Sequence, residues 1–121
     1  MSSDPRHILG AAAEDQARDY LAGQGYQILE RNVRYKVGEL DIVATEGETL
    51  VFVEVRSRSN PNQVHPAATV TPRKQRQVVR AAMAYCQDHN IKDTMIRFDV
   101  VAVLGDKGEI ELYKNAFEAG R

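Results

Sequence analysis

Two carboxylates in apolar segments are the most informative chemical feature of this 121-residue chain. Asp41 lies in the run Leu-Asp-Ile-Val-Ala, Glu54 lies in Val-Phe-Val-Glu-Val, and Arg56 closes the second run. An ionised carboxylate in a buried strand is costly unless a metal ion or another cation compensates its charge. Two such carboxylates on neighbouring strands therefore indicate a binding site, and oxygen ligands favour a hard divalent cation.

Basic residues are concentrated in the middle of the chain, although the formal net charge is only −1. No Asp or Glu occurs between Val55 and Gln87, and the cations in this segment are Arg56, Arg58, Arg73, Lys74, Arg76 and Arg80. A one-signed segment could bind a polyanion such as DNA, and a solvated basic helix face is the alternative interpretation. The small net charge argues against a protein that coats nucleic acid through bulk electrostatics.

Two helix openings are visible in the sequence. Asp4-Pro5 and Thr71-Pro72 both combine a capping residue with a proline suited to the first helical position. The patterns that follow predict helices over residues 5–23 and 72–88.

The helical period also predicts where charged side chains lie. Glu14 falls at the edge of an apolar stripe on the first helix, so its carboxylate is expected to point inward. On the second helix Lys74 aligns with the apolar side, whereas a separate basic stripe is formed by Arg73, Arg76 and Arg80.

Five segments have strand-like patterns, and they span residues 26–35, 40–45, 49–56, 95–104 and 109–113. The second and third are expected to form a hairpin through Glu46-Gly47-Glu48. Because side chains alternate along a strand, antiparallel pairing through this short turn would place Asp41 near Glu54. The third segment is apolar except at Glu54, which is typical of a central strand covered on both faces.

The remaining segments indicate how the chain is organised into a domain, a loop and a terminal segment. We expect one domain over residues 1–121, with a mobile loop at 57–70 that contains His65 and a short terminal segment at 115–120. A loop histidine is more often incidental than catalytic.

No apolar run in the sequence approaches the ~20 residues of a membrane span. The start of the chain has no apolar signal region and Cys86 is a single cysteine, so a cytoplasmic location is predicted.

Several short motifs follow one another in a specific order along nearly the whole chain. They are Ala13-Glu14 through Ala17, Tyr20-Leu21, Gly25-Tyr26, Arg31-Asn32, Gly38-Glu39-Leu40-Asp41, Phe52-Val53-Glu54-Val55-Arg56, Lys74, Arg97-Phe98-Asp99-Val100-Val101 and Asn115-Ala116-Phe117. This series resembles the YraN family, a group of bacterial proteins similar to Holliday junction resolvases, within the restriction-endonuclease-like superfamily whose motif is written PD-(D/E)XK. The resemblance implies an α/β fold with a mixed central sheet of about five strands flanked by helices, in the order α-β-β-β-α-β-β.

The resemblance also implies a metal-dependent nuclease. In the superfamily pattern Asp41 and Glu54 would bind a catalytic Mg²⁺ (or Mn²⁺) with help from the Val55 carbonyl, and Glu14 would be an outer ligand or water contact. A bound cation lowers the pKa of its water and offsets the charge that develops on the phosphate. DNA is the implied partner, branched DNA by similarity to the resolvases. A homodimer, with two active sites on opposing strands, follows from the same analogy.

Position 56 departs from the superfamily motif, which has a lysine where this chain has Arg56. Arginine stays protonated, so it can stabilise a phosphate but cannot act as a general base. Three alternatives remain: hydroxide forms from metal-bound water without a protein base, Lys74 supplies the ammonium group, or the site binds DNA without cutting it. The first two describe a nuclease, with Arg58, Arg73, Arg76 and Arg80 as candidate DNA contacts. The third describes a non-catalytic DNA-binding or scaffold protein.

Overall fold

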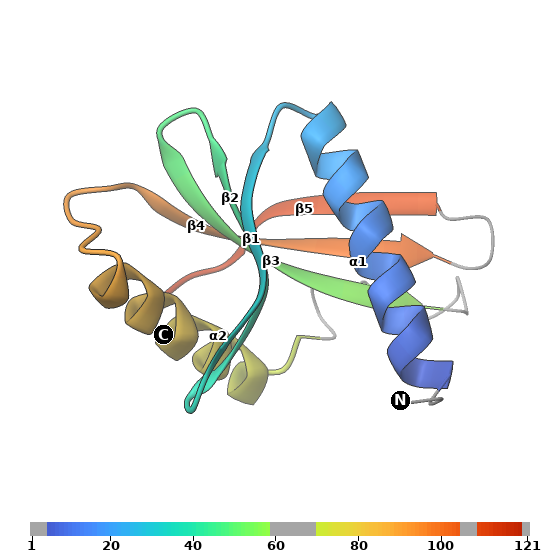
Figure 1. The fold of residues 1–121 in the computed structure, drawn as a ribbon, viewed down its shortest axis with the longest axis horizontal. Coiled ribbons are helices and arrows are strands. Elements are labelled where there is room, and N and C mark those ends of the chain that lie inside the picture. Colours follow the sequence, from blue (N-terminus) through green and yellow to red (C-terminus); the bar gives the residue numbers. More distant parts are fainter. Residues whose placement is uncertain (1–4, 59–69, 105–108, 120–121) are drawn as a thin grey trace.

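The computed structural model describes residues 5–58, 70–104 and 109–119. Figure 1 shows the helices and strands, which are α1 (Pro5–Gly23), β1 (Gln27–Tyr35), β2 (Gly38–Glu46), β3 (Thr49–Arg58), α2 (Pro72–Asp88), β4 (Ile96–Leu104) and β5 (Glu109–Phe117). The predicted α/β class and the order α-β-β-β-α-β-β are confirmed. Among the described helices, neither is long and apolar enough to cross a membrane.

The strands form one mixed sheet in the order β1-β2-β3-β4-β5. Neighbouring strands are antiparallel except for β3 and β4, which are parallel because α2 lies between them in the chain. This order makes β3 the central strand, and its residues 50–54 are buried. The predicted hairpin of the second and third strands and the predicted central position of the third are therefore confirmed.

The sheet separates two apolar clusters, one beneath each helix. Ala17 and Leu21 of α1 pack in a cluster with Val51. On the other face, α2 contributes to a second cluster that includes Phe52 and Tyr85, whose rings meet edge to face at 5.8 Å. Each helix therefore holds its own charged residues against a different face of the same sheet.

The start of α2 follows the predicted chemistry. Thr71 is the N-cap, and its hydroxyl accepts a hydrogen bond from the Lys74 backbone N–H at 3.1 Å, while Pro72 occupies the first turn. The cap satisfies one of the backbone N–H groups that a helix start leaves without a partner. It also fixes the position of Lys74 in the first turn.

Three predicted strand boundaries are wrong by two residues or more, and the first is the start of β2, which lies at Gly38 instead of residue 40. β3 continues beyond residue 56, because Ser57 and Arg58 pair with Val103 and Leu104 of β4, and β5 continues to Phe117 instead of ending at residue 113. Backbone pairing with the buried strand β4 outweighs the polar character of these side chains. The predicted loop therefore starts too early at 57, and its residues 59–69, including His65, lie outside the described residues.

Asp99 is a fully buried carboxylate that links β4 to β5 and to Tyr26, which lies just before β1. Asp99 on β4 is 0% exposed and accepts hydrogen bonds from the Tyr26 hydroxyl at 2.7 Å, the Arg97 guanidinium at 2.9 Å and the Asn115 backbone N–H at 2.9 Å. The last bond spans a bulge, because the β4–β5 register shifts between Phe98 and Val100 and Asn115 adopts a φ of 53°. Asp99 and Arg97 therefore form an ion pair that is part of the core of the fold.

Replacing this carboxylate should destabilise the fold. Asp99→Asn removes the fully buried charged partner of the Arg97 guanidinium, which keeps its pair with Glu46, and we expect a loss of about 3 kcal/mol in the free energy of unfolding. Urea unfolding measures the change. Asp19→Asn is the matched control, since Asp19 forms an exposed pair with Arg18 and should cost less than about 1 kcal/mol. Equal losses in the two variants would contradict the structural role of Asp99.

Candidate functional site

Asp41 and Glu54 meet where β2 and β3 run side by side. The antiparallel register pairs Ile42 with Val53, so Asp41 and Glu54 are the next residues on the two strands. The Val55 backbone N–H donates a hydrogen bond of 2.9 Å to Asp41 Oδ2. Glu54 is only 3% exposed. The structure thus brings together the two carboxylates that the sequence singled out.

The alternation of side chains along β2 is interrupted at Asp41. In a regular strand Leu40 and Ile42 would face the same side, but Leu40 packs in the cluster beneath α2 and Ile42 in the cluster beneath α1. Asp41 lies between them and reaches the backbone of Val55. The prediction for Asp41 and its neighbours assumed that side chains alternate strictly between the two faces. In the structure this alternation holds only from Ile42 onward.

Burial makes the charge of this pair costly. Burial and the negative charge of Asp41 raise the pKa of Glu54 to about 8, while Lys74 and Arg56 act in the opposite direction. Burial also raises the pKa of Asp41, against the effect of the Val55 N–H bond. Near neutral pH the pair therefore tends to keep a proton that a bound divalent cation would displace.

Lys74 and Glu14 approach the pair from opposite sides of the sheet. Lys74 Nζ, from α2, lies 3.5 Å from Glu54 Oε1. Glu14, from α1, has a side chain 17% exposed, and the Arg31 guanidinium lies 3.8 Å from its Oε1. Burial and then the negative charge of Asp41 raise the pKa of Glu14. The predicted inward position of Glu14 is confirmed, and Lys74 is set apart from the arginines as expected.

The residues present fit a hydrated divalent cation. Glu14 Oε1 and Glu54 Oε2 are buried oxygens without a hydrogen-bond partner. Within residues 5–58, 70–104 and 109–119, however, no group of three or more His, Cys, Asp or Glu side chains is arranged to hold a metal ion. A cation at Asp41 and Glu54 would keep several of its waters, as Mg²⁺ commonly does. The role of the Val55 carbonyl as a ligand stays a prediction.

The predicted basic residues divide into two groups. Arg56 is close enough to lower the pKa of Glu54. The stripe on α2 is exposed, on the side of the helix away from its buried residues, and consists of Arg73, Arg76 and Arg80. For Arg58 the structure gives only a backbone position at the end of β3. The structure therefore places Arg56 and Lys74 at the carboxylates and leaves the α2 stripe facing solvent.

A cleft of about 430 Å³ beside Lys74 was missed by the sequence analysis. It is lined by the turn between β1 and β2 and by α2, through Arg34, Tyr35, Lys36, Val37, Gly38, Glu39, Lys74 and Gln77. A signal was present in the sequence, because the short connection between residues 35 and 40 must lie at the same end of the sheet as Asp41. The basic residues Arg34 and Lys36 therefore belong beside the candidate site.

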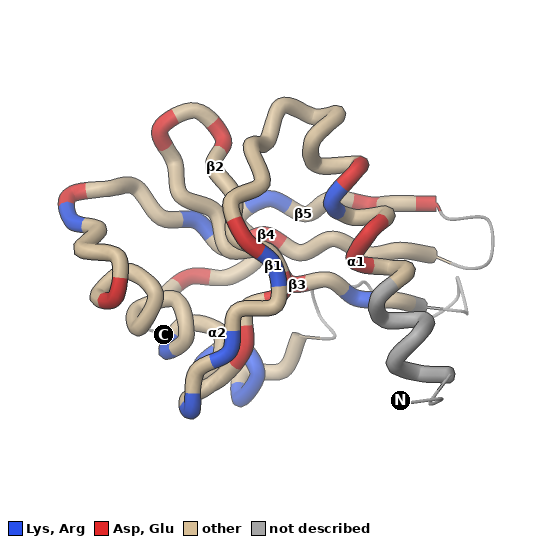
Figure 2. Tube along the Cα trace, viewed as in Figure 1, with Lys and Arg blue, Asp and Glu red and all other residues tan. Residues whose placement is uncertain are grey.

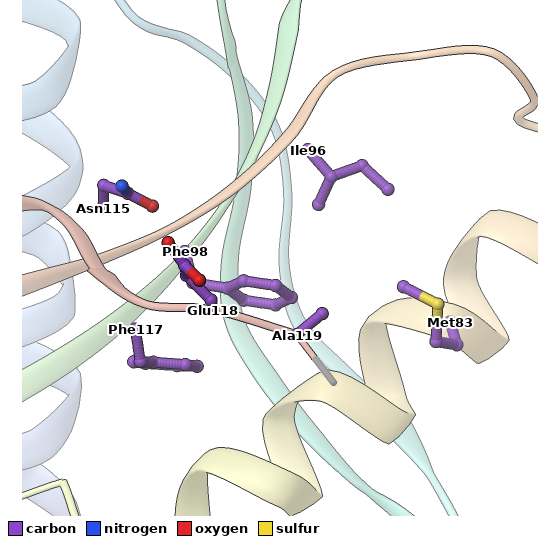
Figure 3. A pocket seen from close by; sticks show the side chains of 7 residues that line it. All are labelled: Met83, Ile96, Phe98, Asn115, Phe117, Glu118 and Ala119. Carbon is purple, nitrogen blue, oxygen red and sulfur yellow. The ribbon is translucent and has the colours of Figure 1, made fainter. Parts of the chain in front are cut away.

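A second cavity of about 300 Å³ opens between α2 and the strands β4 and β5. Figure 3 shows its lining, which consists of Met83, Ile96, Phe98, Asn115, Phe117, Glu118 and Ala119. Glu118 is the single ionisable side chain of this lining, so the cavity offers no carboxylate pair and no lysine. It is not a candidate for chemistry on a phosphate.

The raised pKa of Glu54 predicts a pH-dependent stability in EDTA. Its pKa is higher in the folded protein than the ordinary 4.5 expected on unfolding, so its stabilising effect is complete below pH 4.5 and is lost as pH rises through about 8. Glu54→Gln cannot ionise, so between pH 4.5 and pH 8 its free energy of unfolding should fall by at least about 2 kcal/mol less than that of the wild type. Urea unfolding at the two ends of the range tests this. Glu48→Gln, at an exposed residue, should behave as wild type; a Glu54→Gln profile identical to wild type would contradict the assignment.

Comparison with known proteins places this site in a family. The family model described as "Uncharacterised protein family UPF0102" matches residues 13–103, which include Glu14, Asp41, Glu54 and Lys74. A UPF0102 protein of Geotalea uraniireducens is 48% identical over 91% of this chain and 89% of its own length. Similar proteins from Herminiimonas arsenicoxydans and Chlorobium limicola are 45% and 43% identical, over 94% and 88% of this chain and 90% and 81% of their own lengths. The chain therefore belongs to the UPF0102 family, also called the YraN family.

Proposed function

We propose that the protein is a metal-dependent nuclease that hydrolyses phosphodiester bonds of DNA. The observation that supports this most directly is the pair formed by the partly buried Asp41 and the buried Glu54, with Lys74 Nζ 3.5 Å from Glu54 Oε1. A buried pair of carboxylates whose pKa values are raised is the arrangement expected of a cation site kept ready for its ion. A basic cleft that ends at Lys74 adds a path for a polyanion.

Asp41 and Glu54 would hold the Mg²⁺ or Mn²⁺ ion. When bound, the ion supplies an activated water and neutralises charge on the phosphate. The Val55 N–H fixes Asp41 Oδ2, which leaves the other carboxylate oxygen of Asp41 available as a ligand. Burial around Glu54 excludes bulk water, which strengthens the attraction between the carboxylates and any cation between them.

Lys74 is the best candidate to replace the lysine that position 56 lacks. Its ammonium group comes from the first turn of α2 and already lies against Glu54. It could contact the phosphate and the attacking water from the α2 side of the sheet. Arg56 is close enough to influence the charge of Glu54 and would stabilise the phosphate without accepting a proton.

The alternative is a non-catalytic DNA-binding or scaffold protein. The ion pair between Lys74 and Glu54 favours it, because the lysine already supplies a cation to the buried carboxylate. Under this alternative DNA would bind through the same basic surfaces without being cut. Branched DNA as the preferred substrate, a homodimer and a cytoplasmic location remain parts of the proposal that depend on the resemblance to resolvases and on the sequence.

The nuclease proposal predicts metal-dependent cutting. Labelled linear, flap and four-way-junction DNA would be incubated with the pure protein in Mg²⁺, Mn²⁺ or EDTA. We expect cleavage of at least one substrate with metal and none in EDTA. Asp41→Asn and Glu54→Gln should each lower the rate by at least about 100-fold, because each removes a ligand.

The matched controls are Asp19→Asn and Glu48→Gln, which make the same chemical changes at exposed positions and should cut as the wild type does. If no substrate is cut while DNA still binds, the nuclease proposal fails and the non-catalytic alternative is favoured. Cleavage that persists in Asp41→Asn and Glu54→Gln would point to a contaminating enzyme and would also contradict it.

The proposed role of Lys74 predicts a rescue. Lys74→Gln removes the ammonium group beside Glu54 and should lower the cleavage rate by about 10-fold or more. Arg56→Lys in the Lys74→Gln background returns a lysine to the motif position and should restore part of that loss. Single-turnover cleavage measures both changes. Wild-type rates in Lys74→Gln would show that metal-bound water needs no ammonium group from α2.

A further inference from the structure

We propose that the cleft between the β1–β2 turn and α2 binds the phosphodiester backbone of the DNA strand that enters the candidate site. The inference rests on the proposed function and deepens it, because it assigns the strand-binding surface to Arg34 and Lys36. Neither residue belongs to the basic segment that the sequence singled out.

The cleft carries an excess of positive charge. Its lining contains three cations, Arg34, Lys36 and Lys74, and one acidic residue, Glu39. Arg34 pairs with Glu39 at 3.6 Å, but its side chain is 75% exposed, so most of its guanidinium still faces water. Lys36 is exposed and takes part in none of the ion pairs found among the described residues. Lys74 is paired with Glu54 at 3.5 Å, so the exposed side chains of Arg34 and Lys36 supply most of the positive charge that the cleft offers to a polyanion.

The two walls of the cleft are held at a fixed distance. A Cβ atom at Gly38 would lie 2.7 Å from the Gln77 backbone carbonyl oxygen, so the turn touches α2 and only glycine fits the contact. Tyr35 pairs with Gly38 to close the turn, so Lys36 and Val37 form its tip. The backbone that carries Arg34 and Lys36 therefore needs little reordering when a strand binds, which lowers the entropic cost of binding.

Lys74 connects the cleft to the carboxylates. Lys74 lines it and also lies 3.5 Å from Glu54 Oε1. A phosphate bound at Lys74 would place the neighbouring phosphodiester bond beside Asp41 and Glu54. Figure 2 shows Lys and Arg residues gathered where the β1–β2 turn meets the first turns of α2. The exposed arginine stripe of α2 does not line this cleft.

Binding in EDTA tests the inference without any cutting. Fluorescence anisotropy would measure the affinity of labelled single-stranded and duplex DNA over a series of salt concentrations. Arg34→Gln together with Lys36→Gln should weaken binding by about 10-fold and lower the salt slope by about 2, since two phosphate contacts are lost. The control pair Arg18→Gln and Lys92→Gln removes the same charge outside the cleft, from a partly exposed position and an exposed position, and should change affinity by less than about two-fold.

A geometric variant separates the shape of the cleft from its charge. Gly38→Ala adds no charge but forces the turn away from Gln77, so it should also weaken binding several-fold if the spacing of the walls matters. Circular dichroism and thermal unfolding show whether this variant is folded. If it is not, the Arg34 and Lys36 substitutions, which lie on exposed side chains, decide the question alone.

The outcomes distinguish this inference from the nuclease proposal. Unchanged DNA affinity in the Arg34 and Lys36 double variant, or an equal loss in the control pair, overturns the inference even if the wild type cuts DNA in Mg²⁺. A specific loss of affinity in the double variant supports the inference. If the wild type then fails to cut in Mg²⁺, only the nuclease proposal is lost.

Discussion

The close approach of the partly buried carboxyl group of Asp41 to the buried carboxyl group of Glu54 is the constraint on which the rest of the site depends. Two negative charges in the interior cannot both persist without compensation. Their pKa values are raised, and the compensating groups come from different elements: a backbone N–H of β3, Lys74 of α2 and Arg56. The sheet supplies the carboxylates, and a helix on each face supplies the side chains that approach them.

Another buried carboxylate in the same protein shows what full compensation looks like. Asp99 accepts four hydrogen bonds, from Tyr26, from two nitrogens of Arg97 and from the Asn115 backbone. Arg97 also binds Glu46 at 2.7 Å, which joins Lys114 to the same network. Glu54, equally buried, has one oxygen without any hydrogen-bond partner. This contrast separates a carboxylate whose hydrogen bonds hold the fold together from one that keeps an unsatisfied oxygen.

The sequence was sufficient for the main features of the fold because its signals are local. Asp4-Pro5 and Thr71-Pro72 marked helix starts, and the uniformly apolar run around Phe52 marked a central strand. The sequence was insufficient for the strand ends, because pairing between segments that are distant in the sequence decides where a strand ends. Arg58 is in a strand because it pairs with Leu104.

The candidate site was predictable to the same extent. The short turn around Gly47 sufficed to bring Asp41 near Glu54, and helical spacing set Lys74 apart from the arginines. The break in alternation at Asp41 and the contact of Gly38 with Gln77 depend on how α2 packs against the sheet. No local pattern encodes that packing, so the cleft itself emerged only from the three-dimensional arrangement, although the short connection before Asp41 already placed Arg34 and Lys36 at this end of the sheet.

The central claim is that Asp41 and Glu54 together bind a divalent cation, and calorimetric titration of the pure protein with Mn²⁺ tests it most directly. The account predicts saturable binding near neutral pH, accompanied by proton release that is detected by comparing buffers of different ionisation enthalpy, because Glu54 must lose its proton when the ion enters. Both signals should disappear in Glu54→Gln and Asp41→Asn and persist in Glu48→Gln. Absence of binding to the wild type, or unchanged binding in Glu54→Gln, would contradict the account.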